Sequence, residues 1–315
     1  MRADGIVPAI QARLALALAA PEGDYVALRI GGHTVGWLDP ARAARLSAFA
    51  SVFDCANGEI GLAARLSDCA TRTAAVEDVT RVLAGEGLLS AWRDERYAVA
   101  VEFGAPPLVD IERAAARYFG IRTYAVHING LVRGGGGLRM WLARRSPTKA
   151  IDPGLLDNLV GGGIATGYGV LETLRKEAWE EAGIPADVAA RARPQGSIDI
   201  CRPQPQGLQR ETVFVYDLEL DADFRPANQD GEAVEHRQLT MAEAAELIAD
   251  NGDGAVTADA SLVILDCLLR HGALGPDSPG LRALSAFRHA MLEPVPESPD
   301  RGDGSSGARS WITRP

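Results

Sequence analysis

The pattern of apolar and polar positions predicts two units along the chain, with a change of character near residue 120. In the first unit, short strands beside glycine turns and helices with apolar residues three and four positions apart predict a small α+β domain. Its expected strands are Tyr25–Ile30, His33–Leu38 and Ala98–Phe103, and its expected helices are Pro40–Ala48, Thr73–Ala84 and Asp110–Tyr118.

The second unit, placed at residues 121–275, begins with alternating strands and ends with helices. The run Gly134–Gly137 is typical of a hairpin loop between its first two strands. The strands are expected at Tyr124–Val132, Leu138–Ala143, Gly196–Cys201 and Glu211–Leu220, and the last helices at Met241–Ala249 and Leu262–Leu269. Residues 276–315 are rich in proline, glycine, serine and charge, which predicts a largely mobile tail.

The apolar run Leu14–Ala20 could belong to a signal peptide or to a buried helix. It is at the short limit for a signal peptide and Arg13 lies directly against it, so a buried amphipathic helix is favoured. No apolar run is long enough to span a membrane. Four cysteines without CxxC spacing are typical of reduced thiols, and we expect a cytoplasmic protein.

Composition narrows the classes of partner. The 315 residues are 47% hydrophobic and 23% charged, which is ordinary for a globular protein of two domains. The formal net charge of −10 argues against a nucleic-acid partner, because such binding needs clustered lysine and arginine. A homodimer is plausible because dimers are the commonest assemblies of soluble proteins.

The segment Gly161–Ile184 reads GGGIATGYGVLETLRKEAWEEAGI and points to chemistry on phosphates. It predicts a glycine-rich loop followed by a helix that presents Glu177, Glu180 and Glu181 in one sector. Crowded carboxylates repel one another unless a cation neutralises them, and Mg²⁺ or Mn²⁺ prefers oxygen ligands. A solvated acidic face is the alternative. The opposite, packed face is expected to carry Leu171, Leu174, Ala178 and Ala182.

Other side chains could complete a phosphate site. Gly162 and Gly163 would let backbone N–H groups approach a ligand closely. Three cations precede this loop in the sequence, Arg144, Arg145 and Lys149. They could neutralise phosphate, although a solvated basic loop explains them equally well.

Two further segments remain open in their interpretation. The acidic stretch Asp230–Glu235 is expected to be a loop. In it Glu232 is the candidate fourth carboxylate, either as a metal ligand or as the base that takes a proton from water, and Glu235 competes for that role. Charges alternate with aromatics over Trp92–Tyr97. A salt-bridged entrance to a strand is slightly favoured there over a binding wall.

The glycines and glutamates resemble the Nudix box. In that motif a glycine is followed at fixed spacings by Glu, Arg-Glu, a Glu-Glu pair and a final glycine, and here Gly162, Glu177, the pair Glu180-Glu181 and Gly183 occupy the matching positions. Tyr168 and Lys176 depart from the pattern. The resemblance implies an α/β/α sandwich around a mixed sheet, with Glu177, Glu180 and Glu181 as the metal ligands.

A wider resemblance covers nearly the whole chain. The blocks WRDERY, ERAAARYFGI, VHING, LDNLVGGGI, KEAWEEAGI, VYDLEL and FRPANQDGE are similar to a Nudix branch with its own N-terminal domain, related to the Nudix part of thiamine pyrophosphokinase fusions. This implies hydrolysis of thiamine diphosphate, or of its oxidised or damaged analogues, to the monophosphate. The N-terminal domain would have a substrate-shaping role.

Two other functions stay open. A generic Nudix enzyme would act on a nucleoside diphosphate derivative such as ADP-ribose or a dinucleotide. A catalytically silent module would bind a pyrophosphorylated ligand and regulate a partner, and retention of all three glutamates argues against it.

Overall fold

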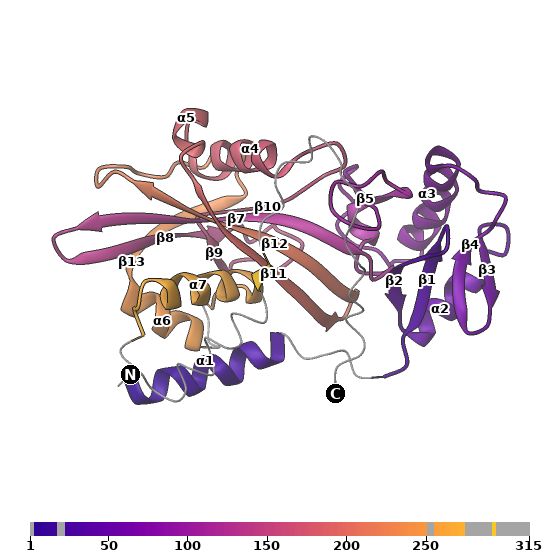
Figure 1. Cartoon of the computed structure of the whole chain (residues 1–315), viewed down its shortest axis with the longest axis horizontal. Coiled ribbons are helices and arrows are strands. Elements are labelled where there is room, and N and C mark those ends of the chain that lie inside the picture. The colour runs from indigo at the N-terminus through magenta and orange to yellow at the C-terminus, as the bar shows by residue number, and fades with distance from the viewer. Residues whose placement is uncertain (1–2, 18–22, 251–254, 275–291, 294–315) are drawn as a thin grey trace.

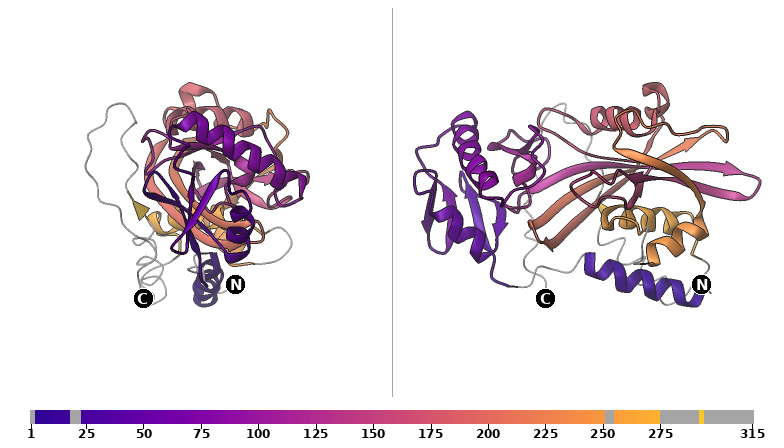
Figure 2. Two further views of the ribbon diagram at one scale, coloured as in Figure 1. Left: turned by 90° about the vertical axis from the view of Figure 1, so that its right-hand side faces the viewer. Right: turned by 180° about the vertical axis from the view of Figure 1, so that it is seen from behind.

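The computed structural model of the chain describes residues 3–17, 23–250, 255–274 and 292–293. Within these ranges a smaller and a larger unit lie side by side, as Figure 1 and Figure 2 show. The expected tail at residues 276–315 falls outside the described residues except for the short strand β14 (Leu292–Glu293). No helix in the described ranges is both long and apolar enough to cross a membrane.

The smaller unit has the expected α+β character and contains strands in places that the pattern did not predict. Its elements are β1 (Val26–Ile30), β2 (His33–Leu38), α2 (Pro40–Ser47), β3 (Phe53–Ala56), β4 (Glu59–Leu62), α3 (Cys69–Gly85), β5 (Arg96–Val99), β6 (Val109–Glu112) and the 3₁₀-helix η1 (Arg113–Ala115). Strands β1 to β4 form one sheet in the order β2-β1-β4-β3, with β1 parallel to β4. Asp39 and Asp68 cap α2 and α3 by accepting hydrogen bonds from backbone N–H groups.

The larger unit is built on one mixed sheet. Its elements are α1 (Ala3–Ala17), β7 (Arg122–Gly134), β8 (Gly137–Arg145), β9 (Leu156–Asn158), β10 (Val160–Gly163), α4 (Val170–Ala182), α5 (Ala186–Ala189), β11 (Arg193–Gln204), β12 (Gly207–Leu220), β13 (Ala233–Thr240), α6 (Met241–Ala249) and α7 (Ala258–Arg270). The order is β13-β8-β7-β12-β11-β14, while β9 pairs with β8 and β10 with β7. Only β7 and β12 run parallel among the named pairs of this sheet. The hairpin at Gly134–Gly137 is confirmed.

Helices cover both faces of this sheet. One face packs on α4 and carries Val126, Ile128 and Phe214, and the opposite face packs on α6 and α7 (Figure 1). Burial of the apolar surface in these two clusters is a major stabilising contribution. The expected architecture, a sandwich of helices around a mixed sheet preceded by a smaller α+β domain, is confirmed.

Four predictions of secondary structure were wrong in whole or in part. The strand expected at Ala98–Phe103 is β5, which begins at Arg96 and ends at Val99. The helix expected at Asp110–Tyr118 is the strand β6 followed by the single turn η1, because the segment pairs with β5 and buries Val109 and Ile111 in alternation. The glycines at Gly161–Gly163 lie in strand β10 and not in a loop. Glu235 lies in strand β13, where a loop was expected.

Helix α1 does not pack with the smaller unit that follows it in sequence. Its side chains Ile6, Val7, Ile10 and Leu14 are buried in the core formed with α6 and α7. This confirms the burial expected for the start of the run at Leu14, while residues 18–20 lie outside the described residues. The smaller unit is therefore bounded on both sides by segments of the larger one (Figure 2).

Backbone contacts join the two units closely. Leu208 N donates to Arg117 O at 2.9 Å, and Thr166 N donates to Arg96 O at 2.8 Å. A Cβ on Gly207 would lie 2.0 Å from Arg117 O, so this position has no room for a side chain. These contacts place residues 93–121 of the smaller unit against the mixed sheet.

Candidate active site

Helix α4 carries the acidic residues and is fixed by one buried face. Val170, Leu174, Ala178 and Ala182 pack against the sheet, and Gly183 ends the helix in a left-handed conformation with φ 64°. Leu171 was expected on the packed face but is 49% exposed. The buried stripe of α4 is therefore narrower than expected.

Glu181 is the most enclosed of the three glutamates. Its side chain is 8% exposed, and one carboxylate oxygen accepts a hydrogen bond from Gly161 N at 2.8 Å. Burial, reinforced by the nearby charge of Glu177, raises the pKa of Glu181 well above its ordinary value. A buried carboxylate held this close to a second one is a position that a cation would stabilise.

Glu177 lies directly over the second glycine of strand β10. A Cβ on Gly162 would lie 2.3 Å from both Cγ and Cδ of Glu177, so the absence of a side chain at Gly162 makes room for the carboxylate. Burial also raises the pKa of Glu177. The absence of a side chain at Gly162 therefore allows close approach of Glu177 to the strand.

Lys176 neutralises two of the acidic side chains in this structure. Its Nζ donates to Glu177 Oε1 at 3.0 Å and to Glu180 Oε2 at 2.7 Å. One lysine thereby holds Glu177 and Glu180 beside each other, while Glu177 and Glu181 both lie against strand β10. The three predicted metal ligands thus lie on one part of α4, with Lys176 paired to two of them.

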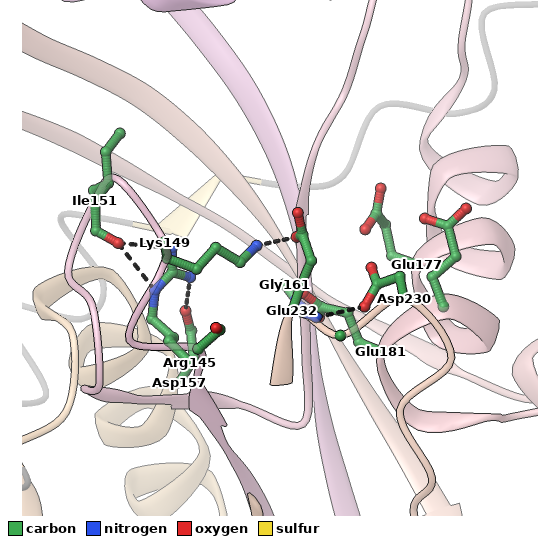
Figure 3. A network of polar contacts seen from close by, with 12 residues as sticks. Arg145, Lys149, Ile151, Asp157, Gly161, Glu177, Glu181, Asp230 and Glu232 are labelled. Atoms are coloured by element: carbon green, nitrogen blue, oxygen red, sulfur yellow. Dashed lines mark hydrogen bonds and ion pairs between the residues drawn. The ribbon is translucent and has the colours of Figure 1, made fainter. Parts of the chain in front are cut away.

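The segment before β13 carries the fourth carboxylate and is attached to the end of α4. Gln229 N donates to Glu180 O at 2.7 Å, and Glu232 N donates to Asp230 Oδ1 at 2.8 Å. In Figure 3, Glu232 contacts Lys149 and Asp230, while Glu181 contacts Gly161. Glu235, the competing candidate, instead forms an ion pair with Arg144 at 2.6 Å.

The three predicted phosphate-binding cations have different surroundings. Lys149 reaches Glu232, as Figure 3 shows, and Arg145 donates to Asp157 Oδ2 at 2.8 Å. Arg144 is held by Glu235 and by the carbonyl oxygen of Gly154, as expected for neighbouring strand residues that point to opposite faces. Lys149 and Arg145 therefore lie near the carboxylates of Glu181, Glu232 and Asp157, here called the acidic cluster, and Arg144 lies apart from them.

The smaller unit contributes residues that the sequence did not assign to the site. Arg93 Nη1 lies 3.2 Å from Glu232 Oε1. The hydroxyl oxygen of Tyr97 lies so near Gly163 that a Cβ at this position would be only 2.1 Å from it. The block Trp92–Tyr97 does form the favoured ion pairs, such as Arg96 with Glu77. Through Arg93 the same block also contacts Glu232. The alternation of charged and aromatic residues, which left a binding wall open as an alternative, was the sequence signal for this contact.

We expect Gly163→Ala to loosen the junction between the units. The new methyl group would collide with the Tyr97 hydroxyl, and overpacking of this kind costs about 1–3 kcal/mol in the free energy of unfolding. In a Tyr97→Phe background the cost should be smaller, because the nearest atom is gone. Urea denaturation of both single variants and the double variant measures the coupling, and strictly additive costs would contradict this contact.

The chemistry of the donors fits a hard divalent cation. Glu177 and Glu181 offer carboxylate oxygens at low exposure; burial raises the pKa of both, and the charge of Glu177 raises that of Glu181 further. Glu232 adds a carboxylate on the facing segment, and no sulfur or imidazole ligand is needed for such an ion. Lys149 and Arg145 stand beside this group, where phosphate oxygens bound to the same ion would meet them.

Comparison with known proteins decides the family. Residues 12–123 match the family described as Domain of unknown function (DUF4743), and residues 122–260 match the NUDIX domain. Nudix hydrolase 24, chloroplastic, of Arabidopsis thaliana is 38% identical over 260 residues, which cover 82% of this chain and 71% of that protein. The chain belongs to the Nudix family.

Two further comparisons describe the extent of the likeness. Nudix hydrolase 20, chloroplastic, of the same plant is 37% identical over 267 residues, again covering 82% of this chain and 71% of the relative. A solved structure from Deinococcus radiodurans is 29% identical, with a TM-score of 0.40, and covers 54% of this chain and 97% of that one.

The protein is accordingly a Nudix hydrolase, a pyrophosphatase that acts on acid anhydrides. Membership implies a small-molecule diphosphate as substrate, and the family typically uses a divalent metal. The predicted resemblance, including the separate N-terminal domain, is confirmed.

Proposed function

We propose that this Nudix hydrolase cleaves thiamine diphosphate, or its oxidised or damaged analogues, to the monophosphate and phosphate, with Mg²⁺ or Mn²⁺, in the cytoplasm. The reaction class rests on one observation above all. Two low-exposure carboxylates, Glu177 and Glu181, lie against strand β10, and Lys149, which contacts a third carboxylate, Glu232, is near enough for its charge to act on Glu181. The choice of substrate rests on the ordered sequence blocks in both domains.

We assign the metal to Glu177 and Glu181, with Glu180 as a further ligand. The ion would bridge phosphate oxygens, stabilise the charge that develops on them and lower the pKa of a bound water. Glu181 is oriented for this role by the hydrogen bond from Gly161 N. For Glu180 to take part, its ion pair with Lys176 has to open, which a divalent charge between the carboxylates would favour.

Glu232 is the proposed acceptor of the proton from the attacking water, or else a fourth metal ligand. Burial opposes its ionisation, but the cations Lys149 and Arg93 outweigh burial and hold the pKa of Glu232 below its ordinary value. It is therefore ionised at neutral pH and can accept a proton. When a diphosphate binds, its oxygens compete for Lys149 and Arg93, which releases the carboxylate.

The remaining proposed contacts concern the substrate phosphates. Arg145 and Lys149 both lie beside the acidic cluster and can donate to phosphate oxygens once their present partners are displaced. Gly162 and Gly163 face opposite sides of strand β10, and the missing side chains make room for Glu177 on one side and for the Tyr97 hydroxyl on the other. Arg144, paired with Glu235, is proposed to act only by fixing β13 against β8.

A panel assay with Mg²⁺ tests the substrate. Release of phosphate should be fastest from oxothiamine or oxythiamine diphosphate or from thiamine diphosphate, and slower from ADP-ribose and dinucleoside polyphosphates. Turnover of the nucleotides alone would replace thiamine compounds by nucleoside diphosphate derivatives as the substrate class. Absence of turnover with every compound would leave a pyrophosphate-binding regulator as the function.

A further inference from the structure

Four polar side chains form a row across the mixed sheet, on the face that packs against α7. This polar row consists of His127 and Asn129 of β7, Asn158 of β9 and Asp217 of β12, which come from the sequence blocks VHING, LDNLVGGGI and VYDLEL. His127 is 7% exposed and each asparagine 1%, and the side chain of Asp217 is 11% exposed. The proposed chemistry uses none of these side chains.

The hydrogen bonds along the polar row all run in one direction. His127 Nδ1 lies 2.8 Å from Asn158 Oδ1, and Asn158 Nδ2 donates to Asn129 Oδ1 at 3.2 Å. Asn129 Nδ2 donates in turn to Asp217 Oδ1 at 3.0 Å. The row ends at Arg270 of α7, whose guanidinium pairs with both oxygens of Asp217.

Asp217 determines this direction. A carboxylate paired with a guanidinium only accepts hydrogen bonds, so Asn129 has to present its amide nitrogen to Asp217. The oxygen of Asn129 then accepts from Asn158, and the oxygen of Asn158 is left to accept from His127. The ring nitrogen that faces this oxygen, Nδ1, therefore carries the hydrogen. Asp157 Oδ1 lies 3.9 Å from the same nitrogen, beyond hydrogen-bond distance.

The ring of His127 lies directly against the backbone of strand β10. His127 and Gly161 are register partners on the antiparallel strands β7 and β10. A Cβ on Gly161 would lie 3.1 Å from Cε1 and 3.2 Å from Nε2 of the ring, so a side chain there would press on the imidazole. The N–H of the same glycine donates to Glu181 Oε2 at 2.8 Å (Figure 3). Gly161 thus contacts both the end of the polar row and a proposed metal ligand.

We propose that His127 is a positioning residue for the hydrolytic reaction. The polar row holds the His127 ring in one orientation, and the ring fixes Gly161 so that its N–H aims the Glu181 carboxylate at the metal. This inference rests on the metal assignment in the proposed function. A buried network in which every member is hydrogen-bonded is rigid. Loss of such support behind a metal ligand typically costs about 10-fold to 100-fold in metal affinity or activity.

The first test reads the direction of the polar row from the ring of His127. Nitrogen NMR of the metal-free protein distinguishes a ring nitrogen that carries hydrogen from one that does not, and sequential assignment identifies His127 among the five histidines. We expect the hydrogen on Nδ1 in the wild type. Hydrogen on Nε2 alone would overturn the inferred direction.

Substitutions at the far end of the polar row should change this signal in a defined way. In Asp217→Asn the row is able to reverse, because an amide both donates and accepts, so hydrogen should appear on Nε2 of His127. The double variant Asn129→Asp with Asp217→Asn should return the hydrogen to Nδ1, since a carboxylate at position 129 again only accepts. An unchanged signal in Asp217→Asn would contradict control of the ring by Asp217.

The second test removes the contact of the ring with β10. In His127→Asn the amide nitrogen takes the place of Nδ1 and can still donate to Asn158, but the ring atoms next to Gly161 are gone. We expect hydrogen exchange of the Gly161 amide in the metal-free protein to accelerate at least about tenfold. The Kd for Mg²⁺ from calorimetry should rise by about 10-fold to 100-fold. At saturating Mg²⁺ kcat should fall less than this, because a bound ion itself draws the carboxylate into place.

Thr212→Val is the matched control. It removes a buried hydrogen bond, from Thr212 to Asp199, on the strand that carries Asp217, but it touches no member of the polar row. Exchange at Gly161 and the affinity for Mg²⁺ should therefore stay at their wild-type values. Equal changes in Thr212→Val and His127→Asn would assign the effect to a general loss of stability and overturn the positioning role.

The outcomes separate this inference from the proposed function. If the wild type bound no Mg²⁺, the metal assignment would fail, while faster exchange at Gly161 in His127→Asn would still establish that His127 fixes β10. Unchanged exchange together with unchanged Mg²⁺ affinity in folded His127→Asn would overturn the positioning role. The NMR measurement on the wild type needs no substitution, so it tests the polar row even if His127→Asn fails to fold.

Discussion

Replacing Glu181 by glutamine is expected to lower kcat by on the order of 10²-fold or more while leaving the metal-free protein at least as stable as wild type. The carboxylate lies at low exposure against Gly161 N, where it would hold the cation that stabilises charge on the phosphates. Glutamine keeps the shape and can still accept the hydrogen bond from Gly161 N. It removes the negative charge that the cation requires.

The effect on stability has a definite sign with pH. Because the pKa of Glu181 in the folded protein is raised well above its ordinary value of 4.5, the folded state holds the proton to higher pH than the unfolded state does. The contribution to stability is complete below the unfolded pKa and is lost as pH rises through the folded pKa. Metal-free Glu181→Gln should therefore exceed wild type in Tm at pH 8, and the difference should shrink toward pH 4.5.

Calorimetric titration with Mg²⁺, steady-state kinetics and thermal scans at both pH values measure these effects. Glu172→Gln is the matched control, because Glu172 lies on the same helix in its exposed first turn. Wild-type turnover and Mg²⁺ affinity in Glu181→Gln would refute the metal assignment. A variant less stable than wild type at pH 8 would refute the unfavourable burial of the charge.

Gly162→Ala is expected to lower kcat by displacing Glu177 rather than by removing a carboxylate. The added methyl would lie 2.3 Å from Cγ and Cδ of Glu177, so the carboxylate has to leave its place over strand β10. Misplacement by about 1 Å near the reacting groups can cost roughly 10²-fold in rate. The loss in the free energy of unfolding should stay near 1–3 kcal/mol, because a side chain can move where a backbone cannot.

The matched control for this variant is Gly136→Ala, at a position where a Cβ meets no other atom within 4 Å. Both variants gain the same methyl group, but only Gly162→Ala touches a predicted metal ligand. Kinetics at saturating Mg²⁺ and urea denaturation should therefore separate them. If Gly162→Ala keeps wild-type kcat and Mg²⁺ affinity, the packing of Glu177 on Gly162 has no catalytic importance.

The sequence predicted the sandwich and its acidic helix because both follow from local patterns. Alternation in residues 124–132 and 211–220 and the spacing of glutamates in α4 are periodic signals that survive folding. The helix expected at Asp110–Tyr118 failed because its apolar residues also fit a two-residue period, and pairing with β5 decided between the two. A local pattern alone does not decide between a helix and a strand in such a segment.

The site was only partly accessible to the same reasoning. Glu177 and Glu181 stand near each other through helix geometry, so spacing alone predicted their proximity. The contact of Arg93 with Glu232 joins residues 139 positions apart, and no local pattern encodes such a pairing. The metal and substrate roles of these side chains stay predictions until a variant or a titration tests them.

The position of α1 has a practical consequence for dissecting this enzyme. Since this first helix is part of the hydrolase core, the smaller unit is topologically an insertion between Ala17 and Arg122. Deleting everything before Arg122 would strip α6 and α7 of an apolar cover and invite aggregation of the remainder. A shortened variant of the enzyme should therefore keep α1, and it should keep residues 93–121, which pack against the mixed sheet.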